Sequence, residues 1–265
     1  MMRVAWALFL AGIAGPAIAG DLRDYCPERP GLNTPACTID PGHVSIETGL
    51  IDWTQDGNAA SRTDLFLVGD TLVRVGLTDR VEARIGWTPF GFVRERDRAK
   101  GTISRVSRVG DVTLGFKANL AHPDGSGASI ALLPYASLPV GRRPIGAGDW
   151  GAGLLIPASY ELSPTLALAL TPEIDAAVDE DGRGRHLAYG GAAGISLKLS
   201  EALSSALELS AIRDRDPSGH SSLLLAGASL GWQAEEGLQF DIGANAGLNR
   251  DTPNIELMLG VSRRF

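Results

Sequence analysis

The chain has 265 residues, of which 44% are hydrophobic, and its charged residues give a formal net charge of −7. An acidic balance makes nucleic acid a poor candidate partner. After residue 20 no apolar run approaches the ~20 residues that a membrane-spanning helix needs. The apolar residues are dispersed among short segments instead, which suits either a soluble sandwich or a membrane barrel.

The first residues have the pattern of a secretory signal peptide. Arg3 precedes an apolar run from Val4 to Ala14, and small residues end the segment at Ala19. We therefore expect residues 1–19 to be a signal peptide, with a retained anchor as the alternative. Its removal takes away one base and leaves 23 basic against 31 acidic residues, a net charge of −8.

The next segment, residues 20–42, is rich in proline and glycine and contains both cysteines, Cys26 and Cys37. In an exported chain an even cysteine count indicates one disulfide, which would close a small loop. The other interpretations are two unpaired thiols or a zinc site. Zinc would require further cysteines or histidines at ligand spacing, and the sequence lacks them.

From His43 onward, about twelve segments have the two-residue period of β-strands. In the third, Val81, Ala83, Ile85 and Trp87 share one face. No helical period competes with this pattern. The segments are 43–53, 63–77, 79–88, 109–121, 127–138, 149–162, 165–178, 184–199, 202–213, 220–234, 237–248 and 254–265.

The connections between these segments alternate in length. Those after even-numbered segments are short, such as 78–79 and 200–201, whereas most of the others are longer and polar, above all Thr88 to Arg108. Short periplasmic turns, long external loops and an even strand number are typical of outer-membrane barrels. We therefore predict an all-β fold, a transmembrane antiparallel up-and-down β-barrel of about twelve strands over residues 43–265.

The second face of these strands carries charged residues, which a dry core could not hold unpaired. They are expected to face the interior, while apolar side chains face lipid with Trp87 and Trp150 near the outer rim and Trp232 near the inner rim. The candidate lumen-lining residues are Arg74, Arg84, Lys117, Glu173, Asp175, His186, Glu208 and Asp241.

Charge on this predicted inner wall is uneven. Strands two to four carry four bases and three acids, a surplus of +1, whereas strands seven to twelve with the first carry one base and six acids, or −5. Either a transverse field selects solutes, or cross-strand ion pairs hold a filled interior together. His186 lies near Glu173 and Asp175, and an ion-paired histidine is more common there than a metal site. We predict no metal and no cofactor.

The chain ends in a strand, Ile255 to Phe265, with apolar residues at alternate positions. We expect this strand to pair with the first one and close the barrel, because hydrocarbon tolerates no free sheet edge. A terminal phenylalanine resembles the ending typical of outer-membrane proteins. That resemblance implies that the barrel assembly machinery recognises Phe265.

The mature sequence as a whole resembles the outer-membrane transporters grouped as the "MetA-pathway of phenol degradation" family. The resemblance rests on "ERPG" from Glu28, "PGHVSIETG", "VGLTDRVEARIGW", "GDVTLGFKANL", "LPVG" and the final "RRF". The cysteine-bracketed segment around "ERPG" departs from the general family pattern. The resemblance implies a channel for small hydrophobic or aromatic compounds in the bacterial outer membrane, and it supplies no functional residues to carry over.

Twelve strands lie between barrels that side chains fill and porins with open water channels, so passage of small solutes is expected. Residues 20–42 either fold into the periplasmic mouth and narrow it or form a short tail. One alternative function is a lipid-facing hydrolase, since outward His220 and Ser222 resemble the pair in outer-membrane phospholipases, although no residue is placed to orient the histidine. The other is a structural scaffold. No catalytic residue is predicted, and the expected partners are outer-membrane lipid and a small solute.

Overall fold

The computed structural model describes residues 22–265, so the expected signal peptide, residues 1–19, lies outside the described part. No helix in the described part is long and apolar enough to cross a membrane. The described residues form these strands: β1 (Val44–Gly57), β2 (Ser61–Val68), β3 (Asp70–Thr78), β4 (Val81–Trp87), β5 (Phe90–Asp97), β6 (Thr102–Arg108), β7 (Val112–Ala121), β8 (Ala128–Leu138), β9 (Gly151–Leu155), β10 (Ala158–Ser163), β11 (Leu166–Val178), β12 (Arg185–Lys198), β13 (Leu203–Asp216), β14 (Gly219–Glu235), β15 (Leu238–Gly247) and β16 (Ile255–Arg264).

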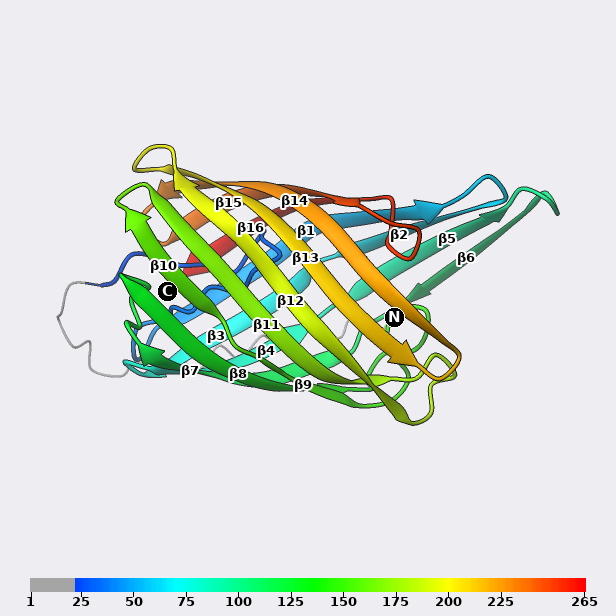
Figure 1. Cartoon of the computed structure of the whole chain (residues 1–265), viewed down its shortest axis with the longest axis horizontal. Coiled ribbons are helices and arrows are strands. Elements are labelled where there is room, and N and C mark those ends of the chain that lie inside the picture. The colour runs from blue at the N-terminus through cyan, green and yellow to red at the C-terminus, as the bar shows by residue number, and fades with distance from the viewer. Residues whose placement is uncertain (1–21) are drawn as a thin grey trace, which may run out of the picture.

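The strands build one closed, antiparallel, 12-strand barrel with extra strand segments (Figure 1). Four of the 12 barrel strands are each divided into two consecutive segments: β2 and β3, β4 and β5, β6 and β7, and β9 and β10. Between β2 and β3 the chain bends at Gly69, whose φ of +73° is unfavourable for residues with a side chain. The predicted fold class is therefore confirmed.

The barrel closes where the last strand meets the first. β16 pairs with β1 from Ser45 opposite Arg264 to Gln55 opposite Ile255. At the very end, the Phe265 N–H donates to the Val44 carbonyl at 2.8 Å, and the Val44 N–H donates back at 3.1 Å. The final residue is thus bound into the sheet, as the sequence predicted, and this pairing leaves neither strand with a free edge.

The stretch from Thr88 to Arg108 was expected to be a polar external loop, and this prediction is wrong. It forms β5, which pairs with β2, and β6, which pairs with β5. Polar strands are stable outside the membrane because pairing with an existing sheet satisfies their backbone groups. Together with β2 and the outer half of β1, they form a strand extension that projects beyond the barrel rim (Figure 1).

The two faces of the wall are inverted relative to a soluble protein. Leu207 and Leu209 on the outside are 50% and 58% exposed, whereas Arg74 and Lys117 on the inside are fully buried. The exposed apolar face is the one that meets membrane lipid. Alternation along the strands therefore confirms the predicted assignment of apolar residues to the outside.

Leu209 lies centrally in β13 and tests this orientation. Substitution Leu209→Arg should destabilise the folded barrel by about 2–4 kcal/mol, because a charge near the bilayer midplane loses its hydration. Urea unfolding in phospholipid bilayers measures the change, with Leu209→Ile as the control that keeps the side chain apolar. Equal unfolding midpoints for the two variants would show that this face does not contact hydrocarbon.

Candidate functional site: the barrel lumen

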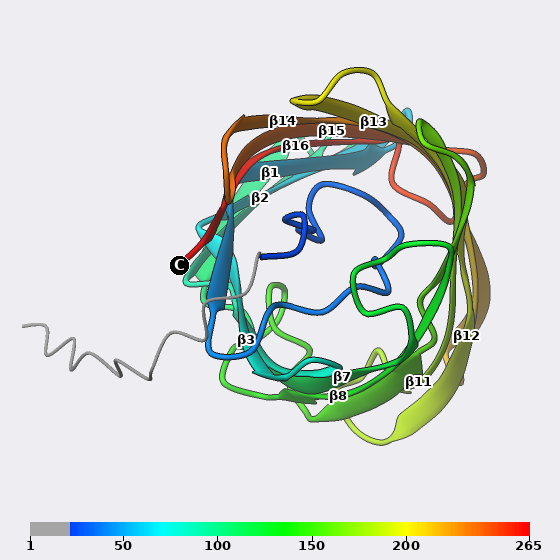
Figure 2. The ribbon, with the colours of Figure 1, turned by 90° about the vertical axis from the view of Figure 1, so that its left-hand side faces the viewer.

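Residues 22–42, the inner segment, run through the interior of the barrel without regular secondary structure. Figure 2 shows this segment in blue inside the ring of strands. An irregular backbone buried inside a barrel needs partners for its N–H and C=O groups. The inner wall has to provide them, and the contacts below show which side chains do so.

Glu28 is the central ionic contact between the inner segment and the wall. Its carboxylate lies 2.5 Å from Arg84 Nη2, 2.5 Å from Lys117 Nζ and 3.7 Å from Arg74 Nε. Arg74 and Arg84 stand directly opposite each other on β3 and β4. Such a like-charge pair destabilises a sheet unless an anion compensates for it, and Glu28 is that anion.

Two wall carboxylates complete this cluster. Glu47 and Glu82 lie 2.9 Å and 2.8 Å from the Arg74 guanidinium. The wall therefore holds three cations and two anions, and Glu28 brings the net charge to zero. Burial by itself would raise the pKa of Glu28, but Arg84, Lys117 and Arg74 outweigh it and hold this pKa well below its usual range.

Acidic side chains of the wall also accept hydrogen bonds from the backbone of the inner segment. Glu208 accepts the N–H groups of Leu32 and Asn33 at 2.7 Å and 3.0 Å. Glu82 accepts the N–H of Ile39 at 2.9 Å. A carboxylate is a strong acceptor for such groups, so these contacts fix the path of the segment at two distant points.

Basic side chains of the wall bind carbonyl groups of the same segment. Arg74 Nη1 donates to the Cys26 carbonyl at 2.9 Å, and Lys117 Nζ donates to the Cys37 carbonyl at 3.1 Å. The predicted disulfide joins these two residues, with their Cα atoms 6.6 Å apart. The covalent loop and the wall cations therefore hold the same part of the chain.

Arg29 makes a second ionic contact, on the side of the barrel where it closes. Its guanidinium lies 2.8 Å from Asp52 on β1 and 3.5 Å from Asp241 on β15. Neighbouring Gln239 donates to the Arg29 carbonyl at 3.2 Å. The inner segment is thus attached to β1 and β15 as well as to β3, β4 and β7.

Glu173 and Asp175, also expected in the lumen, lie on β11 away from these clusters. Tyr135 is on β8, and its Oη donates to Asp175 on β11 at 2.7 Å, across the intervening strand β9. Both carboxylates are only partly buried. They line the interior without holding the inner segment.

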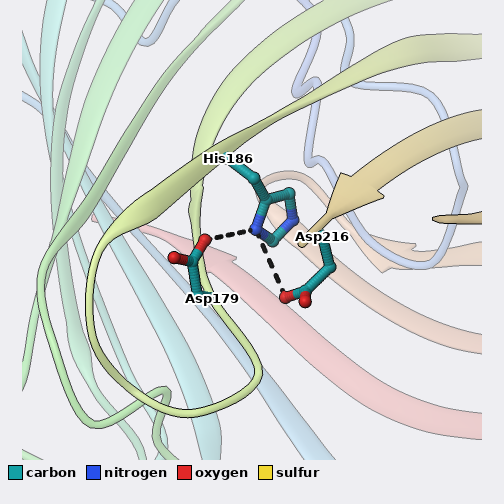
Figure 3. Close-up of side chains that lie close together, drawn as sticks. All are labelled: Asp179, His186 and Asp216. Carbon is teal, nitrogen blue, oxygen red and sulfur yellow. Dashed lines mark hydrogen bonds and ion pairs between the residues drawn. The ribbon is translucent and has the colours of Figure 1, made fainter. Parts of the chain in front are cut away.

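His186 contacts different carboxylates from those expected (Figure 3). Its Nδ1 lies 2.9 Å from Asp179 and 3.4 Å from Asp216, and its Nε2 lies 3.0 Å from Asp214. Glu173 and Asp175 are not among its contacts, because the register sets His186 opposite Ala177, two residues nearer the outer end of β11 than Asp175.

The cluster of His186 with Asp179, Asp214 and Asp216 is suited to two kinds of interaction. Ligand atoms of Asp179, His186 and Asp216 lie within 4.8 Å of one another, close enough to hold a divalent cation. Because a carboxylate lies beside each ring nitrogen, a protonated His186 can also donate a hydrogen bond from both nitrogens and pair with these carboxylates without a metal.

The outward pair His220 and Ser222 does not have the geometry of a hydrolase. Ser222 Oγ accepts a hydrogen bond from Arg213 Nη1 at 2.8 Å. An arginine is always protonated and cannot take the serine proton. His220 is exposed near the start of β14, opposite Arg215 of β13.

A cavity of about 510 Å³ separates the inner segment from the wall of β11 to β14. Small residues line this wall, including Ala167, Ser196, Ala206 and Gly231. Turn residues Pro164 and Glu201 border it too, so the cavity reaches the end of the barrel. The space remains because the ionic contacts hold the inner segment mainly against the opposite side.

Of the predicted lumen residues, Arg74, Arg84, Lys117, Glu208 and Asp241 contact the inner segment, whereas Glu173, Asp175 and His186 do not. Sequence analysis did not identify Glu28 and Arg29 as their partners. The surplus of positive charge on strands two to four was the available signal. It required an anion from elsewhere, and the neighbouring segment contains one.

Comparison with known proteins gives one family and a set of similar folds. A family model described as "Putative MetA-pathway of phenol degradation" matches residues 28–265. No curated protein matches this chain in sequence. The family match begins at Glu28, the residue at the centre of the ionic cluster.

Three solved structures share the fold at low sequence identity. The COG4313 outer membrane channel from Pseudomonas putida F1 has a TM-score of 0.66 and 14% identity, covering 85% of this chain and 96% of its own. A KdgM porin has a TM-score of 0.51 and 10% identity, covering 84% and 99%. A NanC porin has a TM-score of 0.50 and 9% identity, covering 83% and 98%.

Removing the charge of Glu28 should loosen the inner segment. Glu28→Gln leaves an unpaired positive charge in the buried cluster, which is strongly destabilising. We expect amide protection over residues 28–39 to fall by about tenfold or more in hydrogen exchange. Glu201→Gln, at a side chain 94% exposed, is the matched control. Equal protection in both variants would contradict the role assigned to Glu28.

The same cluster predicts a pH dependence. Because the pKa of Glu28 is lowered in the folded state, its contribution is complete above the ordinary carboxyl pKa of about 4.3 and is lost as the pH falls through the lowered pKa. Protection of residues 28–39, corrected for intrinsic exchange, should therefore be constant near neutral pH and decline in strong acid. In Glu28→Gln this decline of protection in acid should be absent. An identical decline in both proteins would refute the role of Glu28 in the pH dependence.

Proposed function

The chain belongs to the family described as "Putative MetA-pathway of phenol degradation", and from this premise we propose that it is an outer-membrane channel for small aromatic or hydrophobic compounds. It is an integral protein of the bacterial outer membrane, exported by its signal peptide. Support comes from the fold shared with an outer membrane channel and with porins. Passage is passive, since a barrel of this size provides a route.

The observation that carries the proposal is the cavity beside the inner segment. It is bordered by the segment on one side and by small residues of β11 to β14 on the other, and it reaches the periplasmic turns. The inner segment acts as a plug that narrows the lumen to this route. The disulfide and the ionic contacts keep the plug on one side of the passage.

The wall beside the cavity also indicates the class of solute. Ala167, Ser196 and Ala206 offer neither charge nor bulk. The basic residues Arg74, Arg84 and Lys117 are engaged by Glu28, so they are not free to attract anions. The charged residues that line the cavity are mainly acidic, among them Glu161, Glu201 and Glu208. The passage therefore favours small uncharged solutes such as phenols over anions, while the ion pairs of the opposite wall hold the inner segment in place.

We make two further assignments. We assign no hydrolase role to His220 and Ser222, because the hydroxyl of Ser222 accepts a hydrogen bond from Arg213 and its partner is not a base. Phe265 is 67% exposed and paired to Val44. We propose that the barrel assembly machinery recognises Phe265 in the C-terminal strand before the barrel closes.

A bulky residue in the cavity should reduce conduction. Ala206 lines the cavity from β13, and Ala206→Trp should lower single-channel conductance of the refolded mature chain in a planar bilayer, and slow phenol uptake into proteoliposomes. Ala228 is exposed on the lipid face of the adjacent β14, so Ala228→Trp is the matched control. A silent wild-type barrel, or two variants that conduct alike, would refute passage along this route.

A further inference from the structure

The strand extension outside the membrane separates its charges between two faces. Arginines gather on one side, and register sets Arg94 opposite Arg105 and Arg62 opposite Arg96. The acidic residues of β5, Glu95 and Asp97, alternate with these arginines and therefore lie on the other side. We call the set Arg62, Arg94, Arg96 and Arg105 the basic face.

The basic face continues the lipid-facing side of the barrel. Trp53 stands between Leu257 and Phe66 in neighbouring strands, and Leu257 is 40% exposed on the outer surface. Phe66 lies opposite Phe92, and the ring centroids from Trp53 to Phe66 and from Phe66 to Phe92 are 6.4 Å and 6.2 Å apart. Such aromatic rows lie at headgroup level.

The arginines follow this aromatic row directly. Arg94 comes two residues after Phe92, and Arg96 two residues later, which sets the two basic rows about 7 Å and 14 Å farther out along the strand. Aromatic side chains thus mark the boundary of the hydrocarbon, and guanidinium groups occupy the level just beyond it.

The chain itself neutralises these arginines only in part. Asp64 is the acidic residue beside them, and it already binds Arg62 at 2.7 Å and accepts from Trp53 Nε1 at 3.3 Å. Arg94 is 3.8 Å from it. Among residues 22–265, Arg96 and Arg105 form no salt bridge, so four positive charges meet one negative charge. Like charges directly opposite destabilise a sheet, and an external anion would remove that cost.

We propose that the basic face binds the phosphate groups of a phosphorylated glycolipid in the outer leaflet of the membrane. Arginine pairs with phosphate through two parallel hydrogen bonds. A lipid fits better than a free anion, because the aromatic row places the arginines at the depth of headgroups and on the side that faces lipid. The contact anchors the extension to the membrane surface and is independent of conduction through the lumen.

Native mass spectrometry of the refolded mature chain, titrated in detergent with bisphosphorylated lipid A, tests this proposal. The triple variant Arg94→Gln, Arg96→Gln, Arg105→Gln should bind lipid A about tenfold more weakly or worse. A charge-matched control replaces three exposed arginines elsewhere, Arg80, Arg142 and Arg183, by glutamine and should bind as the wild type does. Dephosphorylated lipid A should bind the wild type as weakly as bisphosphorylated lipid A binds the first variant.

Thermal unfolding without lipid A separates binding from a structural role. The first triple variant should be about as stable as the wild type, because losing a like-charge pair offsets the loss of the long, partly exposed contact between Arg94 and Asp64. Unchanged lipid A affinity in that variant, equal losses in both triple variants, or tight binding of the dephosphorylated lipid would each overturn the proposal. Clear destabilisation of the first variant would show that these arginines serve the fold instead.

Discussion

The ionic contact between Glu28 and the wall cations is the interaction on which the interior of this barrel depends. Strand alternation and closure place Arg74, Arg84 and Lys117 inside, away from bulk water. Buried cations without anions would oppose folding by several kcal/mol. The wall carboxylates cover only two of these charges, so the barrel needs the inner segment as much as that irregular segment needs the wall for its backbone groups.

This mutual dependence makes the lumen asymmetric. The cations lie on β3, β4 and β7, and they hold the disulfide loop against their own side of the barrel. The wall of β11 to β14 presents many small residues to the segment, contacts it through Glu208, and retains a cavity beside it. One set of charges therefore determines both where the barrel is filled and where a solute can pass. Because these cations are paired with Glu28, they are not free to attract that solute.

The outer surface follows the same alternation with a different solvent at each level. In the barrel wall, outward positions hold leucines such as Leu207 and Leu209, then an aromatic row, and beyond it the arginines of the extension. The backbone stays in paired strands from one level to the next, apart from a bulge between Gly49 and Ile51 and the bend at Gly69. The side chains change because hydrocarbon, headgroups and water each stabilise different groups. A polar segment can thus remain a strand after it leaves the membrane.

Much of this architecture is a local property of the sequence. The period of two, the alternating connection lengths and the terminal strand determined the barrel and the inward direction of Arg74, Lys117 and Glu208. Other features were decided only by tertiary structure. Thr88 to Arg108 forms strands because neighbouring strands offer partners, and His186 meets Asp179 because of the register. Glu28 meets Lys117 across 89 residues, and Leu32 meets Glu208 across 176. No local pattern encodes such contacts, since they depend on closing the barrel around a segment whose path its own sequence does not specify.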